Sequence, residues 1–558
     1  LSAALIWTYG TITLLGRPFS ILEVAVAPVV FGLGIDYAIH LQRGYEEAKK
    51  HTSSAAYAWV KSFSIIRVAL TLAVVTTVSA FLASSLSPLP PLRTFGITLA
   101  LGVVCAFIAS TVTVGALHVV VEKTTGIKKR KTIDLSGFAK AATNFQKRNT
   151  ARILLVVIIL TTSSVFLAGT KLDTSFELTD FLSEEDMPIM EVRSDIYESY
   201  DAAAWKSVTI LIEPKSGEDS LNGERDILRG LEFLDLRISA IPDVVTPINT
   251  DSQRPSYDGL YPILRDAVEM NSTFGDKYHL GIFDGELDIV DDFEEGDISA
   301  AIHSLLLNDS IGEPLRGQTW SERTAMHVAL TDDNSSLRYL KIRVDVIAET
   351  SEQTSDLAEE FEKQAALIES EKYIDGEVHI GGEVMMIHSI FSGLVVSQVE
   401  STGVSLLVSI LVLFVLTRRL GQSLVVILPV AISGSWVVGS MAVLGLNWNV
   451  LTIMITALTV GLGIDYSIHV WRSFEANRKS GLGVWDSMTK MYATTGTALI
   501  MSAGTTICGF LVLKLSPIPV IQDFGVVSSI SVAFSLILAL FVLPGLLAAE
   551  VRSSNGDN

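Results

Sequence analysis

The stretch Gly32-Leu33-Gly34-Ile35-Asp36-Tyr37-Ala38-Ile39-His40 returns almost unchanged as Gly461-Leu462-Gly463-Ile464-Asp465-Tyr466-Ser467-Ile468-His469. Each copy lies in a long apolar run, 21–42 for the first and 450–471 for the second. A carboxyl group at the centre of a membrane helix costs about 3 kcal/mol on insertion scales, so such residues usually face a cavity, a partner or a proton path. Two aspartates in matched apolar frames therefore indicate a shared function.

The repeat extends far beyond these nine residues. Further matched pairs are Leu15-Gly16 with Leu444-Gly445, Thr76-Thr77 with Thr505-Thr506, Ser87-Pro88 with Ser516-Pro517, and Phe95-Gly96 with Phe524-Gly525. Every pair is separated by 429 positions, so the register holds across four apolar segments without a gap. The pattern indicates an internally duplicated helical bundle. Duplicated halves with functional groups near their interface are typical of secondary transporters.

Composition places the chain among integral membrane proteins. It has 558 residues, 49% of them hydrophobic, and a mean hydropathy of +0.44. Apolar runs of about 20 residues are long enough to cross a bilayer. The candidate spans are 1–16, 21–43, 63–86, 93–121, 152–169, 394–416, 423–444, 449–473, 493–514 and 521–548.

Charge divides the chain into a membrane part and an acidic part. The net charge is −20, but residues 171–390 hold 48 of the 61 acidic residues and 17 of the 41 basic ones. Basic short loops, which usually face the cytoplasm, place this acidic part outside. We expect a multi-pass protein of the cell membrane. Its predicted parts are a first bundle of four spans (1–122), a basic cytoplasmic linker (123–151), a transmembrane helix (152–169), an extracytoplasmic α/β domain (170–393), a second bundle of five spans (394–548) and a cytoplasmic tail (549–558).

The acidic domain carries the alternation of strands and helices. Residues 206–213 and 339–348 alternate apolar and polar side chains at the period of a β-strand, whereas 221–240 and 351–370 have apolar residues at helical spacing. This order predicts small βαβ modules. Between them, 251–308 is a less regular acidic insertion.

The repeated motif suggests how the aspartates are positioned. Gly32 lies one helical turn before Asp36, and Gly461 one turn before Asp465. A missing side chain there lets a neighbouring helix approach closely, so we expect the two motif helices to meet face to face, each bringing its aspartate and the following tyrosine to the contact. Burial favours the neutral form of a carboxyl group, and no Lys or Arg lies mid-span to fix the charged form. The alternative is that both aspartates only cap or hydrogen-bond a helix interface and never change their protonation state.

Nearby polar residues are weaker candidates. His40 and His469 are relay candidates, but a histidine near the membrane surface is often an amphipathic edge residue. Thr76, Thr77, Thr505 and Thr506 could line a polar path, although threonine also packs between helices and bonds its own backbone. The two cysteines, Cys105 and Cys508, lie in apolar runs, and no metal-ligand spacing is present. The sequence predicts no cofactor and no metal.

The duplicated GxxxDY pattern, flanked by an α/β domain, resembles the resistance–nodulation–division (RND) superfamily, and within it the MMPL-type exporters of hydrophobic and amphiphilic molecules. The resemblance implies RND-type helical bundles with sterol-sensing-like membrane domains and a porter-like α/β domain. It implies a proton relay at Asp36, Tyr37, Asp465 and Tyr466, with lipids or other amphiphiles as substrates and H⁺ as the coupling ion. It also implies twelve helices in the family, so the chain is expected to lack the N-terminal helices and the first outer domain.

Two other functions fit the same pattern. One is a non-transporting sensor of sterol or isoprenoid lipids of the Patched type, and the other is a SecDF-like accessory of protein translocation. No nucleotide-binding loop, nucleophile elbow or zinc signature favours an enzyme, and no nucleic-acid partner is expected. The substrate, the choice between H⁺ and Na⁺, and the oligomeric state, with a homo-oligomer as one option, are left open.

Overall fold

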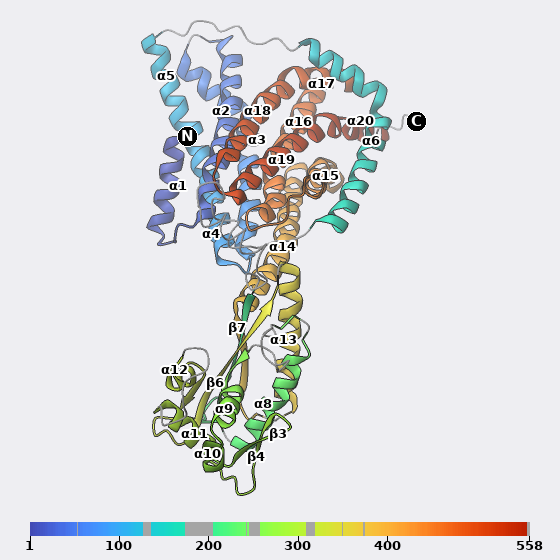
Figure 1. Cartoon of the computed structure of the whole chain (residues 1–558). Coiled ribbons are helices and arrows are strands. Elements are labelled where there is room, and N and C mark those ends of the chain that lie inside the picture. Colours follow the sequence, from blue (N-terminus) through green and yellow to red (C-terminus); the bar gives the residue numbers. More distant parts are fainter. Residues whose placement is uncertain are drawn as a thin grey trace. The chain divides into compact units, whose positions relative to one another are not determined.

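A computed structural model of the chain describes residues 1–52, 54–125, 136–172, 205–221, 223–241, 243–244, 257–307, 318–348, 350–371 and 374–554. The chain divides into two compact units (Figure 1). The helical unit comprises Leu1–Asp186 and Ser392–Asn558, and the α/β unit comprises Met187–Phe391. Of the basic segment predicted as a linker (123–151), residues 126–135 lie outside the described residues.

Long apolar helices make up the helical unit. Nine of the helices described are long and apolar enough to cross a membrane. The helices are α1 (Ser2–Leu14), α2 (Val26–Lys49), α3 (Ala55–Ala83), α4 (Pro90–Ile108), α5 (Val114–Thr125), α6 (Ser136–Lys171), α14 (Glu383–Thr417), α15 (Leu420–Leu444), α16 (Ile455–Lys479), α17 (Val484–Met491), α18 (Thr497–Leu511), α19 (Pro519–Phe541) and α20 (Leu543–Ser554).

Several of the predicted spans differ in length from their helices. The span expected at 1–16 is α1, whose 13 residues reach about 20 Å, less than the roughly 30 Å of a bilayer core. Helix α6 runs for 36 residues, because the polar residues before 152, expected to form a linker, continue the same helix. Helix α14 begins at Glu383 and not at 394.

Short irregular segments join these helices. Two are π-helical, η3 (Ala109–Thr113) between α4 and α5, and η8 (Tyr492–Gly496) between α17 and α18. The others are 3₁₀ turns: η1 (Ile21–Ala25), η2 (Ser84–Leu86), η7 (Thr452–Met454) and η9 (Val512–Leu515). Ser20 and Glu23 form a capping box at the start of η1, which is followed directly by α2.

The two halves of the duplication contact each other through residues at matched positions. Phe95 of α4 and Phe524 of α19 occupy matched positions, and their rings meet edge to face with centroids 6.4 Å apart. Helix α16 lies at the centre of the unit, because every residue from Ile455 to Ile468 is buried. A helix that is buried on all sides must be apolar all round, so its one aspartate is conspicuous.

The α/β unit is built on an antiparallel sheet with the strand order β2-β6-β1-β7, and β5 also pairs with β6. A separate hairpin pairs β3 with β4. The strands are β1 (Trp205–Glu213), β2 (Tyr257–Asp258), β3 (Leu280–Phe283), β4 (Glu286–Ile289), β5 (Val328–Leu330), β6 (Leu337–Ile347) and β7 (Glu377–Gly382). The helices are α8 (Glu224–Ser239), α9 (Leu260–Met270), α10 (Ser272–Lys277), α11 (Asp297–Leu306), α12 (Trp320–His327) and α13 (Ser351–Glu371).

The predicted strands and helices of this unit are confirmed. Strands β6 and β7 both run antiparallel to β1, which lies between them, so β6, α13 and β7 form a βαβ unit split by the central strand. Alternate residues of β1, Val208, Ile210 and Ile212, are buried, as the period-two pattern predicts. Helices α8 and α13 pack side by side (Figure 1).

The acidic insertion is more regular than its sequence suggests. Within 251–308, helices α9, α10 and α11 and the β3–β4 hairpin are ordered elements. Helix α9 buries Leu260, Ile263, Leu264 and Ala267, which are spaced three or four residues apart as one helical face requires. The acidic residues around them make this short apolar stripe hard to recognise in the sequence.

A buried ion-pair network supports the insertion and yields a stability prediction. Arg323 donates to Asp258 and Asp266, each at 2.8 Å. Burial on its own lowers the pKa of Arg323, but its bonds and the charges of these aspartates outweigh burial and raise the pKa. Because Arg323→Leu removes the cation that these two carboxylates share, it is expected to cost about 2–3 kcal/mol. Thermal unfolding in detergent should show a Tm lower by roughly 5–10 °C.

A surface ion pair provides the matched control for this prediction. Arg338 lies 3.9 Å from Asp332, and both side chains are exposed. Exposed pairs contribute about 0–1 kcal/mol, so Arg338→Leu should leave the Tm within roughly 2 °C of wild type. Equal shifts for the two variants would contradict a stabilising role for the Arg323 network.

Candidate functional site

The two motif aspartates are buried inside the helical unit. Asp36 lies on α2 and Asp465 on α16, with 5% and 2% of their surfaces exposed. Among the described residues, the ion pairs include none that joins either carboxyl group to a Lys or Arg. Neither carboxyl group is therefore held in a permanent ion pair with a Lys or Arg of the described chain.

Asp36 contacts two polar side chains. The hydroxyl of Ser502 on α18 donates to Asp36 Oδ1 at 2.5 Å. His40, one turn further along α2, places its Nε2 3.3 Å from the same oxygen. Ser502 belongs to the second half of the duplication and Asp36 to the first, so this hydrogen bond joins the two halves.

Asp465 has a looser version of the same arrangement. Thr77 of α3 donates to the carbonyl of Gly461 at 2.8 Å, and its hydroxyl lies 3.4 Å and 3.5 Å from the two carboxyl oxygens of Asp465. The matched Thr506 of α18 lies 3.4 Å from the carbonyl of Gly32. The two sites are therefore related by the repeat, and again each carboxyl group faces a hydroxyl of the opposite half.

The match between the sites is not complete. The position that corresponds to Ser502 in the first half is Ala73, which has no hydroxyl. Asp36 therefore accepts a close hydrogen bond that Asp465 cannot have. This difference makes the two acids chemically unequal, although their motifs are nearly identical.

The motif glycines contact other helices than the sequence suggested. A Cβ atom on Gly32 would lie 2.8 Å from Thr506 Cγ2 on α18, and one on Gly461 would lie 3.3 Å from Ala80 Cβ on α3. The glycines therefore admit α18 and α3, so the expectation that they join α2 to α16 face to face is wrong. The reason is that Gly and Asp share one helical face, and this face is turned towards the hydroxyl-bearing helix of the opposite half.

Helices α2 and α16 meet instead through their histidines. The imidazole rings of His40 and His469 stack in parallel, with centroids 4.1 Å apart and an interplanar angle of 6°. His40 also contacts Asp36. The structure therefore brings three of the predicted residues, Asp36, His40 and His469, into contact across the two halves.

The motif tyrosines flank the aspartates. Tyr37 and Tyr466 are both buried, and each interacts electrostatically with both Asp36 and Asp465. The Tyr37 ring packs edge-on against Phe107. Its hydroxyl has no hydrogen-bond partner among the described residues, so it is available to a group that approaches the aspartates.

The other two threonines lie differently. Thr76 donates to the carbonyls of Leu72 and Ala73 in its own helix. Thr505 is exposed and donates to the carbonyl of Ser502. Both hydroxyls thus bond the local backbone, so the structure brings only Thr77 and Thr506, of the four, to the motif helices.

Sequence reasoning overlooked Ser502, which lies at the aspartate site, and Arg43, which forms a separate contact between α2 and the second half. Ser502 was missed because a search for matched pairs passes over a serine whose counterpart is alanine. Arg43 was missed because it is near the end of α2. It donates to the carbonyl of Thr494 at 2.6 Å and to the hydroxyl of Thr497 at 2.5 Å. Thr494 lies in the π-helical segment η8, and π-helical turns are frequent at functional sites.

One group of three residues in the α/β unit is close enough together to hold a metal ion, although the sequence indicated no metal ligands. Glu213, Glu377 and His379 place ligand atoms within 4.8 Å of one another among the described residues. Glu213 and Glu377 pair directly across β1 and β7, and His379 Nε2 lies 2.8 Å from Glu213. Exposed acidic groups commonly lie this close together without an ion, so this surface group carries no functional assignment.

The chain matches the MMPL family model over residues 2–152 and 271–555. Among curated proteins, it is 24% identical to the putative membrane protein MJ1562 of Methanocaldococcus jannaschii, over 74% of this chain and 94% of that protein. It is 26% identical to the hopanoid transporter HpnN of Burkholderia multivorans over 30% of this chain and 18% of that protein. It is also 26% identical to Protein patched homolog 1 of Danio rerio over 23% of this chain and 10% of that protein.

Solved structures share the fold. The hedgehog release protein Disp from the water bear Hypsibius dujardini aligns with a TM-score of 0.70 at 14% identity, covering 98% of this chain and 66% of that one. SecDF aligns with a TM-score of 0.51 at 15% identity, covering 100% of this chain and 58% of that one. The chain thus spans nearly all of MJ1562 and about two thirds or less of these two structures. By its family match, its duplicated bundle and its fold, the protein belongs to the MMPL family of the RND superfamily.

Proposed function

We propose that the protein uses proton influx to export lipids or other amphiphiles. The protons pass through the cluster of Asp36, Tyr37, Asp465 and Tyr466, with His40 and His469 in a supporting role. The observation that carries this proposal is the position of the two carboxyl groups. Both are buried, neither pairs with a Lys or Arg of the described chain, and each faces a hydroxyl group from the opposite half.

The arrangement offers a way to convert protonation into movement. A charged carboxylate holds a hydroxyl donor about twice as strongly as a neutral group does. When Asp36 takes up a proton, its hold on Ser502 weakens, and the same applies to Asp465 and Thr77. Because these bonds join the two halves, each proton that passes changes the contacts between them, and we infer that the halves then rock against each other.

The substrate class and the orientation are part of the same proposal. HpnN, a relative by sequence, is named as a hopanoid transporter, which favours a lipid or amphiphile here. The basic loops are expected to face the cytoplasm and the α/β unit the exterior of the cell membrane. The proton would then enter from the side of the α/β unit.

The experiment is a flux assay in liposomes that contain the reconstituted protein and an internal pH dye. An inward proton gradient is imposed with and without total membrane lipid from the native host. We expect the protein-containing liposomes to acidify faster with the added lipid than without it. With the lipid, they should also acidify faster than protein-free liposomes. An equal inward Na⁺ gradient without a pH gradient should not move lipid in a parallel assay that follows fluorescent lipid leaving the bilayer.

Two outcomes would contradict the proposal. Acidification equal to that of protein-free liposomes, with or without lipid, would favour the lipid sensor, which needs no flux. Lipid movement that follows the Na⁺ gradient alone would keep export but replace the coupling ion.

A further inference from the structure

Helix α14 carries a row of four buried serines that the motif analysis did not include: Ser397, Ser401, Ser405 and Ser409. They recur every fourth residue and therefore share one side of the helix. The opposite side is apolar and exposed, for example at Val399, Leu407 and Leu411. From the first to the last serine the row extends about 18 Å along the helix, more than half of a bilayer core of about 30 Å.

Two serines of the row have partners on α3 and on the turn that follows it, in antiparallel order. Ser397 shares a hydrogen bond of 2.6 Å with Ser87, just beyond η2. Eight residues further along α14, Ser405 donates to the carbonyl of Ala80 at 3.1 Å. Moving inwards along α14 therefore means moving backwards along α3. The next inward turn of α3 carries Thr77, whose hydroxyl faces Asp465.

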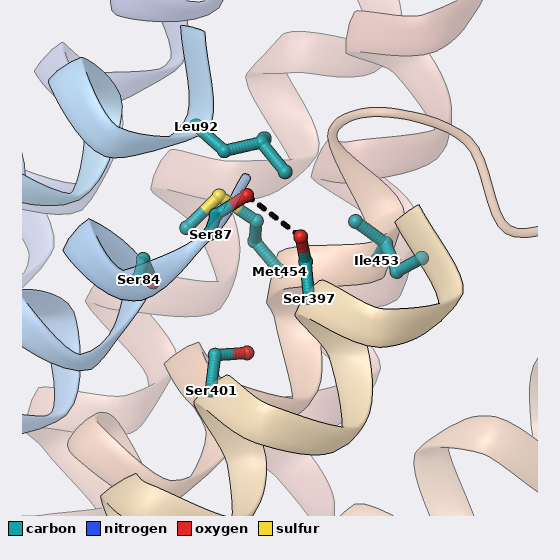
Figure 2. A pocket seen from close by; sticks show the side chains of 7 residues that line it. All are labelled: Ser84, Ser87, Leu92, Ser397, Ser401, Ile453 and Met454. Carbon is teal, nitrogen blue, oxygen red and sulfur yellow. Dashed lines mark hydrogen bonds between the residues drawn. The ribbon is translucent and has the colours of Figure 1, made fainter. Parts of the chain in front are cut away.

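A small cavity lies beside the first two serines of the row (Figure 2). It has a volume of about 10 Å³ and is lined by Ser84, Ser87, Leu92, Ser397, Ser401, Ile453 and Met454. This is close to the volume that one water molecule requires. The cavity lies at the end of the bundle that carries the turn between α3 and α4.

Two hydroxyl groups of this region are buried without a hydrogen-bond partner among the described residues. Ser84 lines the cavity and is 2% exposed, and Ser409, at the inner end of the row, is 1% exposed. Leaving a buried hydroxyl unsatisfied costs about 1–3 kcal/mol. Serines that only filled space between helices would not need these free hydroxyls, whereas a chain of hydroxyls and water would use both.

We propose that the serine row of α14, together with Ser84, Ser87 and Thr77, is the path by which protons reach Asp465 from the α/β side of the membrane. This inference rests on the proposed proton-driven function. Each hydroxyl or water accepts a proton on an oxygen lone pair and releases its own proton to the next oxygen. The last proton forms an O–H bond on the Asp465 carboxylate, and each hydroxyl group ends as it began.

The test compares alanine variants in the liposome acidification assay. The triple variant Ser401→Ala, Ser405→Ala, Ser409→Ala removes three hydroxyls and leaves the space between the helices open. Ser440→Ala is the control, because Ser440 is in the same unit but donates to the carbonyl of Trp436 in its own helix. We expect proton influx to fall at least about 10-fold in the triple variant and to stay at the wild-type rate in the control, with folding checked by Tm.

Asp465→Asn, measured alongside, separates the two proposals. If the triple variant keeps the wild-type rate and Asp465→Asn does not, the serine path is overturned and the relay stands. If Asp465→Asn also keeps the wild-type rate, the serine path is overturned together with the relay role of Asp465. A triple variant that unfolds is replaced by Ser401→Ala alone, for which influx unchanged from wild type would also overturn the path.

Discussion

Proton influx is expected to fall by about 100-fold or more when either Asp36 or Asp465 is replaced by asparagine. Asparagine has nearly the same size as aspartate and retains a carbonyl oxygen, so it can still accept the hydrogen bond of Ser502 or contact Thr77. What it loses is the ability to take up and release a proton. The liposome acidification assay measures this loss directly, and the Tm of each variant shows that the fold is preserved.

A third variant controls for the removal of one negative charge. Asp486, in the first turn of α17, is exposed, so Asp486→Asn makes the same chemical change outside the cluster. It should acidify the liposomes at the wild-type rate. Wild-type rates in both cluster variants would refute the relay. Loss in one variant alone would assign transport to that aspartate and leave the other with a structural role.

The two aspartates have different neighbours, so a comparison of the residual influx rates of the two variants is also informative. Asp36 contacts both Ser502 and His40, whereas Asp465 has only the longer contacts with Thr77 among its described neighbours. If transport needs both groups, the two asparagine variants should be equally inactive despite this difference. Unequal residual rates would show that protons can bypass one of the two sites.

The repeat with its constant offset made much of this architecture predictable. It located the apolar segments, the matched motif helices and the residue types that the two halves bring together. It also predicted the strands β1 and β6 and the helices α8 and α13, because their apolar periods are clear. These features depend on local pattern, and a single sequence records local pattern well.

The parts that could not be predicted depend on which surfaces meet. A glycine indicates that a helix approaches closely, but not which one, and the helices at Gly32 and Gly461 proved to be α18 and α3. The serines of α14 resemble ordinary small residues until their partners on α3 are seen. Ser502 could not be found through the repeat, because Ala73 occupies the matched position.

The matched glycines Gly96 and Gly525 are expected to tolerate little added volume. A Cβ atom on Gly96 of α4 would lie 2.6 Å from the carbonyl oxygen of Phe81 on α3. One on Gly525 of α19 would lie 2.6 Å from the carbonyl oxygen of Phe510 on α18. Because a backbone oxygen cannot rotate away as a side chain can, the helices themselves must separate.

Alanine at either glycine should therefore cost about 1–3 kcal/mol and lower the Tm by roughly 5 °C or more. The control is Gly509→Ala in α18, where an added Cβ meets no atom within 4 Å. The same change there should be neutral or slightly stabilising, since alanine favours a helix over glycine by about 1 kcal/mol. Thermal unfolding that ranks Gly509→Ala with Gly96→Ala would contradict the packing argument. The preceding residues, Phe95 and Phe524, contact each other across the two halves, so a separation at either glycine should also displace this contact and lower the folded yield.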